Sequence, residues 1–328
     1  MDKKYKAGKL LPAFFIRKWM KRLMFRKNFL KLTFTLLILI TSTHSLPAQT
    51  KSKIDLSTPD GQLMAMRKDT CSTIDGKTVI YTWHGEIYSR RRGEADQKLF
   101  NVEGMNIRQC GTVKDEKRGT GFRTVSREIM LYLDPKTNEI LDKWENPWLG
   151  REVNVIHVAN DPVNFGQGFF ARTKDGEPTI KWPDIVTEDS WYNQQTIPLF
   201  YHNVLQGDYQ KYVGGAYHAA EMFTSFGSLD DLLNDNDSTK VRGGGWSRIS
   251  DYLPWMEMQG REGVLYAHAM SWKVDKFEDL SVNLKNYINE REPTYKNPPP
   301  LDDQRPNQTS WTVFKNSLEG SKLPRGGH

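Results

Sequence analysis

The sequence predicts a mainly β fold: one large antiparallel sheet, barrel-like (calycin-like) or strongly curled, with one C-terminal helix and long loops. From about Thr70 to Val158, apolar and polar residues alternate, and turn signals separate the runs. No helical period interrupts these runs, as expected for sequential antiparallel strands. The same alternation returns in three later segments. A single sheet of this kind accommodates all of them.

The first strands are expected at residues 78–90, 98–110, 122–133, 139–144 and 152–158. Asp75-Gly76 supplies a turn before the first of them, and Asp134-Pro-Lys-Thr-Asn138 supplies a hairpin turn between the third and fourth. Residues 165–212 are rich in Trp, Pro and Gln and predict only short strands and long loops.

The later segments 216–226, 241–249 and 263–274 predict three further strands. Ser228 caps a short helix that ends near residue 233. Residues 276–291 place Phe277, Leu280 and Leu284 on one face and predict the long helix. A proline-rich strap follows at 297–306, and the residues around Trp311 and Phe314 are expected to anchor the chain end.

The net charge of +6 comes from the first 48 residues, which hold 11 Lys and Arg against one acid. The remaining 280 residues carry a net charge of −4, so a nucleic-acid partner is not expected. A basic stretch precedes the short apolar run at residues 32–40, which is too short to span a bilayer. We therefore expect a signal peptide over residues 1–48, a periplasmic or secreted protein, and no stable membrane span once the signal is removed.

After the signal we expect a linker at 49–68, one β-rich domain at 69–318 and a flexible tail at 319–328. Export would allow Cys71 and Cys110 to form a disulfide. If Cys71 lay on a first strand, however, two strand spacings would separate the cysteines by about 10 Å, and a disulfide tolerates at most about 7 Å between α-carbons. The sequence therefore favours two unpaired, buried cysteines.

Motifs for nucleophilic hydrolysis, phosphate binding, zinc proteolysis and thiol redox chemistry are all missing. The informative signal is instead four polar residues on apolar strand faces, where burial demands a partner. These residues are Arg127, His157, Glu221 and His268. If their faces converge, they form an acid–base pocket with Tyr217 and Tyr266.

Other interpretations remain open. Arg127 and Glu221 could form a structural ion pair, and a histidine on an apolar face is often a core residue. His84 and Glu86 could join a zinc site with His157 or His268, but their spacing does not favour a metal, so neither a metal nor another cofactor is expected. Tryptophans could line an aromatic pocket or stack on sugars; candidates for substrate contact are Trp83, Tyr217, Trp246, Arg248, Trp255 and Tyr266.

Several blocks of sequence occur in a recognisable order. They include Trp144-Glu-Asn-Pro-Trp-Leu-Gly150, the run from Val155 to Val163, Glu221-Met-Phe-Thr224, Trp246-Ser-Arg248, Leu253 to Met258 and Thr309-Ser-Trp311. In these blocks the chain resembles an exported bacterial and fungal family known as domain of unknown function 1838. The resemblance covers roughly residues 69–314. The resemblance implies that residues within these motif blocks are stronger candidates for the functional site. They are His157, Asn160, Asp161, Glu221, Arg248, Trp255 and, within Tyr266-Ala-His268, His268.

The combined expectation is an exported protein with an aromatic-lined pocket. Acting as a metal-independent isomerase, lyase or hydratase on a small organic molecule, it would use His157 or Glu221 as the base, with Asp161 and His268 as further catalytic candidates. Arg127 or Arg248 would stabilise a developing anion. Two alternatives stay open: a non-catalytic carrier of a small ligand, and a carbohydrate-active protein using carboxylates such as Glu221 and Asp161.

Overall fold

The computed structural model describes residues 53–202, 205, 207–234, 236–239 and 242–320. The chain divides into one unit at residues 1–49 and a second at residues 50–328. The predicted signal peptide therefore lies outside the described residues, as does the tail from residue 321. Within the described residues, no helix is both long enough and apolar enough to cross a membrane.

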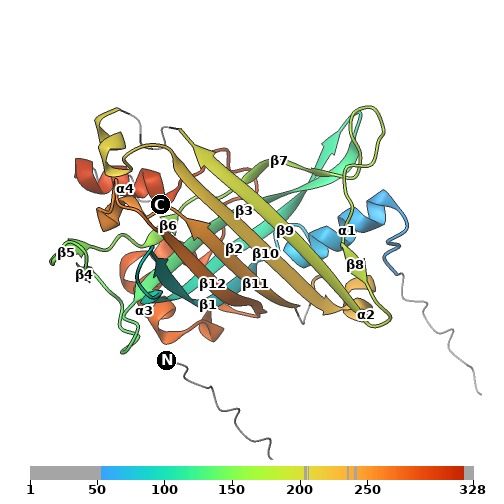
Figure 1. The fold of residues 1–328 in the computed structure, drawn as a ribbon. Helices are drawn as coiled ribbons and strands as arrows, with labels where there is room; N and C mark the ends of the chain where they lie inside the picture. Colours follow the sequence, from blue (N-terminus) through green and yellow to red (C-terminus); the bar gives the residue numbers. More distant parts are fainter. Residues whose placement is uncertain (1–52, 203–204, 206, 235, 240–241, 321–328) are drawn as a thin grey trace, which may run out of the picture. The chain divides into compact units, whose positions relative to one another are not determined.

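The fold is mainly β, as predicted, and is built on one ten-stranded antiparallel sheet (Figure 1). Its path begins with three long strands, β3 (Gly119–Leu133), β2 (Gln97–Asp115) and β1 (Val79–Arg90), and continues through β12 (Val264–Val274), β11 (Arg242–Ser250), β10 (Tyr217–Ser228) and β9 (Ser190–Tyr201). The short strands β6 (Val158–Asn160) and β7 (Phe165–Phe170) pair with β3, and β8 (Ile185–Val186) pairs with β9. In the described residues, these two ends of the path are not paired with each other, so the sheet is open.

Shorter elements surround the sheet. A separate hairpin joins β4 (Lys143–Asn146) to β5 (Arg151–Asn154). The α-helices are α1 (Pro59–Thr70), α2 (Leu229–Leu233), α3 (Val282–Arg291) and α4 (Ser310–Glu319). The 3-10 helices are η1 (Gly207–Tyr212), η2 (Pro254–Met256), η3 (Phe277–Asp279) and η4 (Pro293–Lys296).

The sheet has two differently covered faces. Its inner face carries Phe100, Tyr132 and Leu265, which pack with Trp255 of η2 and Phe314 of α4. Its outer face carries Ile107, Ile129 and Leu131, which pack under Leu284 and Ile288 of α3. Strand β3 is thus buried on both faces, whereas the outer face of β12 is exposed: Met270 keeps 70% of its surface.

Several elements differ from the sequence prediction. The strand expected at 152–158 is divided into β5 and β6, so His157 lies in the irregular segment between them, and the helix expected at 276–291 is divided into η3 and α3. Helix α1 occupies the second half of the predicted linker, β9 is a 12-residue strand within the segment expected to be irregular, and α4 is a helix at the expected anchor. Each helix starts with a threonine cap, Thr58 for α1 and Thr309 for α4, whose side chain accepts a hydrogen bond from the first turn. The alternation in β9 is masked by its many polar residues.

Cys71 and Cys110 form a disulfide, so the prediction of unpaired cysteines was wrong. Cys71 does not lie on a strand; it ends helix α1, and the helix brings its α-carbon to 5.9 Å from that of Cys110 on β2. The bridge lies among Leu63, Phe122 and Ala171. It ties α1 to the buried part of the sheet.

Arg127 fastens residues 293–308, which include the proline-rich strap, to the outer face of β3. Its Nη1 donates to the carbonyls of Thr294, at 3.2 Å, and Asn297, at 2.6 Å. Its Nε lies 3.0 Å from Asp161 Oδ2, and Asp161 Oδ1 accepts from Arg305 Nη2 at 2.7 Å. One carboxylate therefore joins two arginines that are 178 positions apart in the chain.

Replacing both cysteines by alanine should lower the free energy of unfolding by about 2–4 kcal/mol, because the unfolded chain is no longer constrained. Urea unfolding of the wild type and the double variant measures this loss. Adding reductant should weaken only the wild type. Equal stability of the two proteins without reductant would contradict the structural role of the bridge.

Asp161→Ala should destabilise the fold by about 3–5 kcal/mol, because it leaves the Arg127 guanidinium buried without its carboxylate. The matched control is Asp142→Ala, which removes an exposed ion pair with Arg291 and should cost at most about 1 kcal/mol. Urea unfolding of both variants makes the comparison. A loss at Asp161 no larger than that at Asp142 would contradict the role of the Arg127–Asp161–Arg305 cluster, here called the clamp.

Candidate functional site

The strongest cluster of polar side chains lies on the inner face, where Glu221 of β10 and Arg248 of β11 are cross-strand neighbours. Arg248 Nη1 donates to Glu221 Oε1 at 2.7 Å, and Arg248 Nη2 donates to the Tyr217 hydroxyl at 3.4 Å. Burial works against the charge of Arg248, but Tyr217 and Glu221 together hold its pKa above the usual value. The arginine is therefore a fixed positive charge on the inner face of the sheet.

Glu128 of β3 belongs to the same cluster. Burial raises the pKa of Glu128, and the Glu221 carboxylate raises it further, against the opposing influence of Arg108, Asn106 and Arg248. Along the sheet, β3 is separated from β10 by four strands: β2, β1, β12 and β11. Glu128 on β3 and Glu221 on β10 nevertheless interact electrostatically. Glu128 consequently holds its proton to a higher pH than an exposed glutamate does.

Aromatic side chains surround these charges. Tyr217 is fully buried and meets the ring of Trp311 in α4 at 4.4 Å between centroids. Tyr132 lies 5.2 Å from the ring of Trp255, and burial raises the pKa of its hydroxyl. Trp246 lies two residues from Arg248 on the same face of β11. The cluster therefore combines hydrogen-bonding groups with large apolar surfaces.

Trp83 of β1 reaches the inner face because its cross-strand neighbour is Gly104. A β-carbon on residue 104 would lie 2.1 Å from Trp83 Cε2, which no side chain can tolerate. Only glycine leaves the space that this indole fills. Gly104 thus positions one wall of the cluster.

Solvent reaches part of the cluster. The side chains of Arg248 and Glu221 keep 24% and 21% of their surface exposed. Phe223, two residues beyond Glu221 on the same face of β10, is 38% exposed. Phe223 is thus more exposed to solvent than the ion pair.

The structure groups most of the predicted contact residues with Glu221. Trp83, Tyr217, Trp246, Arg248 and Trp255 all lie on the inner side of the sheet. Five of the six candidates predicted for substrate contact thus lie on the face that carries the carboxylate–guanidinium pair, and one of them, Tyr217, contacts Arg248 directly.

His268 and Tyr266 lie on the other face. The buried residues of β12 are Leu265, Ala267 and Ala269, whereas the side chain of His268 is 58% exposed. Alternation had placed both residues inside because Tyr266, Met270 and Trp272 make that face look apolar. Small alanines instead mark the inner face, where they leave room for Trp83 and Trp246.

Arg127 and Asp161 also lie outside the cluster. Both belong to the clamp on the outer face of β3, and their side chains are 11% and 10% exposed. The structure therefore does not bring Arg127 together with Glu221. Its neighbour in sequence, Glu128, faces inward in its place.

His157 lies at the edge of β3, between the rings of Tyr132 and Tyr287. Its Nδ1 accepts a hydrogen bond from the backbone N–H of Tyr132 at 3.1 Å. Burial lowers the pKa of His157 to about 4, against the attraction of Asp142. The neutral His157 ring packs between two tyrosines and accepts a hydrogen bond from the backbone. None of these contacts is with a charged residue of the Glu221 cluster.

Sequence reasoning missed Glu128. From Val125 to Leu133 the odd-numbered residues of β3 are aliphatic apart from Arg127, so alternation singles out Arg127 and not its even-numbered neighbour. The even-numbered face also contains Met130 and Tyr132, and that is the one signal that both faces are buried. Among the described residues, no group of three or more His, Cys, Asp or Glu side chains is arranged to hold a metal ion.

The buried state of His157 predicts a pH dependence. Above pH 6.5 the imidazole is neutral in both the folded and unfolded chain, but below it the unfolded chain binds a proton first. His157 should therefore remove roughly 3 kcal/mol of stability as the pH falls from 6.5 to about 4, and no more below that. In urea unfolding, the stability difference between wild type and His157→Gln should shift by that amount between these two pH values. A constant difference would contradict this.

Comparison with other proteins identifies a family. No curated protein matches the chain. One solved structure, Ail, the attachment invasion locus protein of Yersinia pestis, aligns with 60% of this chain and 97% of its own at 5% identity and a TM-score of 0.14, and a likeness this weak carries no argument. The family model described as "Protein of unknown function (DUF1838)" matches residues 76–318. This match covers well over half of the sequence and confirms the resemblance seen in its motif blocks, so the chain belongs to the DUF1838 family.

Proposed function

We propose that the inner face of the sheet is the active site of an enzyme that moves protons on a small organic molecule. The observation that carries this proposal is a pair of carboxyls on one face of the sheet in unlike surroundings. Glu221 has an arginine partner, whereas burial and the Glu221 charge raise the pKa of Glu128. Two carboxyls held in unlike environments are a recurrent arrangement for an acid and a base in one site.

The proposed site needs a sheet that curves around it. Glu128 and Glu221 interact across four intervening strands, a distance of well over 10 Å along a flat sheet. Their interaction supports a strongly curled, barrel-like sheet with the polar cluster in its interior. The helix α4 and the turn η2 would close one end through Trp311 and Trp255.

Each group has a role in this proposal. Glu128 delivers or removes a proton, Arg248 stabilises the negative charge that develops on the substrate, and Tyr217 orients a polar group. Trp83 and Trp246 bind the apolar body of the molecule. This set suits isomerisation, elimination or hydration, in which a proton moves without a redox cofactor.

The proposed setting is outside the cytoplasm. The disulfide between Cys71 and Cys110 supports this, because such bonds persist in oxidising compartments. The signal sequence expected over residues 1–48 would carry the chain there.

The test is a turnover screen. Purified protein is incubated with a panel of hydroxy acids, keto acids and enol ethers, and consumption is followed by mass spectrometry. Once a substrate is found, Glu128→Gln should lower kcat/KM by about 100-fold or more, because it removes the transferable proton. Glu152→Gln is the matched control, since this glutamate is 64% exposed on β5 and should leave the rate unchanged.

Two results would overturn the enzyme proposal. One is full activity in Glu128→Gln when circular dichroism shows the variant to be folded. The other is binding of a panel compound that is lost in Arg248→Gln, with no turnover at any pH between about 5 and 9; this would identify a carrier.

A further inference from the structure

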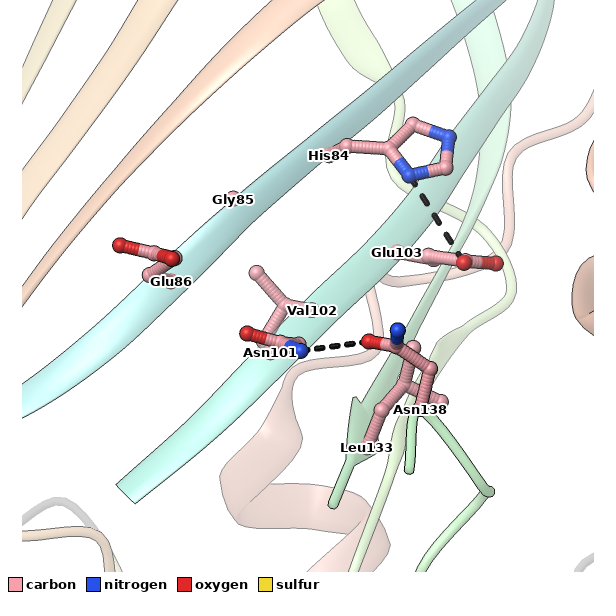
Figure 2. A pocket seen from close by; sticks show the side chains of 8 residues that line it. All are labelled: His84, Gly85, Glu86, Asn101, Val102, Glu103, Leu133 and Asn138. Carbon is pink, nitrogen blue, oxygen red and sulfur yellow. Dashed lines mark hydrogen bonds and ion pairs between the residues drawn. The ribbon is translucent and has the colours of Figure 1, made fainter. Parts of the chain in front are cut away.

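A second candidate site lies on the outer face, separate from the inner cluster. A hollow of about 320 Å³ opens between β1, β2 and the turn after β3. Figure 2 shows His84 and Glu86 on β1 and Asn101 and Glu103 on β2, with Asn138 reaching in from the turn. All but one of these five side chains come from adjacent strands and project from one face of the sheet.

The polar groups of the hollow are held in place. His84 Nδ1 lies 3.7 Å from Glu103 Oε1, and Glu103 also accepts a hydrogen bond from the Ser281 hydroxyl. Asn101 Nδ2 donates to Asn138 Oδ1 at 2.5 Å, as Figure 2 shows. The Glu103 side chain is only 13% exposed. The hollow therefore presents fixed carboxylate and amide groups rather than mobile surface chains.

One of the two carboxylates in the lining of the hollow is paired with a lysine. Glu86 accepts from Lys98 Nζ at 2.5 Å and from the Tyr88 hydroxyl at 2.6 Å. The hydrogen bond from Lys98, with that from Tyr88, lowers the pKa of Glu86, so the pair stays ionised and nearly neutral as a whole. With Glu103 the only other acid in the lining, the hollow suits an uncharged polar molecule better than an anion.

Flat rings stand beside the hollow. The rings of His84 and Trp272 are stacked, 5.4 Å apart with an angle of 8° between their planes. Tyr88 and Tyr266 form a second stack, 5.0 Å apart at 6°. Between them lies Met270, the cross-strand neighbour of His84, which is 70% exposed. Exposed apolar surface of this kind beside fixed polar groups marks a binding surface.

We propose that this hollow binds one sugar unit of a saccharide. The C–H groups of a pyranose ring would pack on the His84–Trp272 stack and Met270, while its hydroxyls would donate to Glu103 and accept from the Asn138 amide N–H. A saccharide is favoured because it is uncharged, has apolar ring faces and carries hydroxyls around its rim. The site is independent of the proton-transfer site, which lies on the opposite face.

The test uses ligand-observed saturation-transfer NMR with the β-methyl glycosides of glucose, galactose, mannose and N-acetylglucosamine. At least one of these glycosides should bind with a Kd of about 1 mM, as expected for a single sugar in a shallow site. Trp272→Ala and Glu103→Gln should each weaken that binding about 10-fold or more. Tyr192→Ala is the matched control: this exposed aromatic on β9 lies on the same face but far from the hollow and should leave binding unchanged.

Absence of binding by all four glycosides up to about 10 mM would overturn the proposal. Binding that survives both Trp272→Ala and Glu103→Gln would overturn it as well, since the sugar would then sit elsewhere. Glu128→Gln separates the two sites, because it should leave glycoside binding intact. Loss of binding in Glu128→Gln alone would place the sugar on the inner face and end the outer-face proposal.

Discussion

The structure depends on the burial of β3 on both of its faces. A strand in this position has no solvent to receive its charged side chains, so each one needs a partner inside the protein. Arg127 points outward and is met by Asp161 and two carbonyls of the strap. Glu128, the next residue, points inward and has a hydrogen bond from Asn106 and the charges of Arg108 and Arg248 nearby. The two residues are satisfied in opposite ways.

This difference separates a structural group from a candidate chemical one. Arg127 is surrounded by acceptors that stabilise its charge, and any change of partner would cost stability. Glu128 is surrounded by groups that pull in both directions, and burial with Glu221 prevails. A carboxyl in that state can take up or release a proton with little rearrangement. The fold therefore uses one ion pair to hold its strap in place, and the neighbouring glutamate is the group proposed for proton transfer.

Alternation in the sequence predicted the strands β1, β2, β3, β10, β11 and β12 within a few residues, because each carries a strong two-residue period. It could not predict which face of β12 lies inside. That choice depends on Trp83 and Trp246 of the neighbouring strands, whose large side chains face the small residues Ser271 and Ala269 of β12. The pairing of Cys71 was missed for a similar reason: a helix, not a strand, carries it to Cys110.

The aromatic residues of β12 explain why the outer face was mistaken for the inner one. In most half-buried strands a Tyr, Met and Trp on one face mark the core. Here those residues remain exposed, and the cost of exposing them is offset only in part by stacking with Tyr88 and His84. Strand β12 thus has exposed aromatic rings on its outer face and buried alanines on its inner face. The inner face is covered by tryptophans of the same chain, whereas the rings on the outer face stay exposed, which is why a ligand site is proposed there.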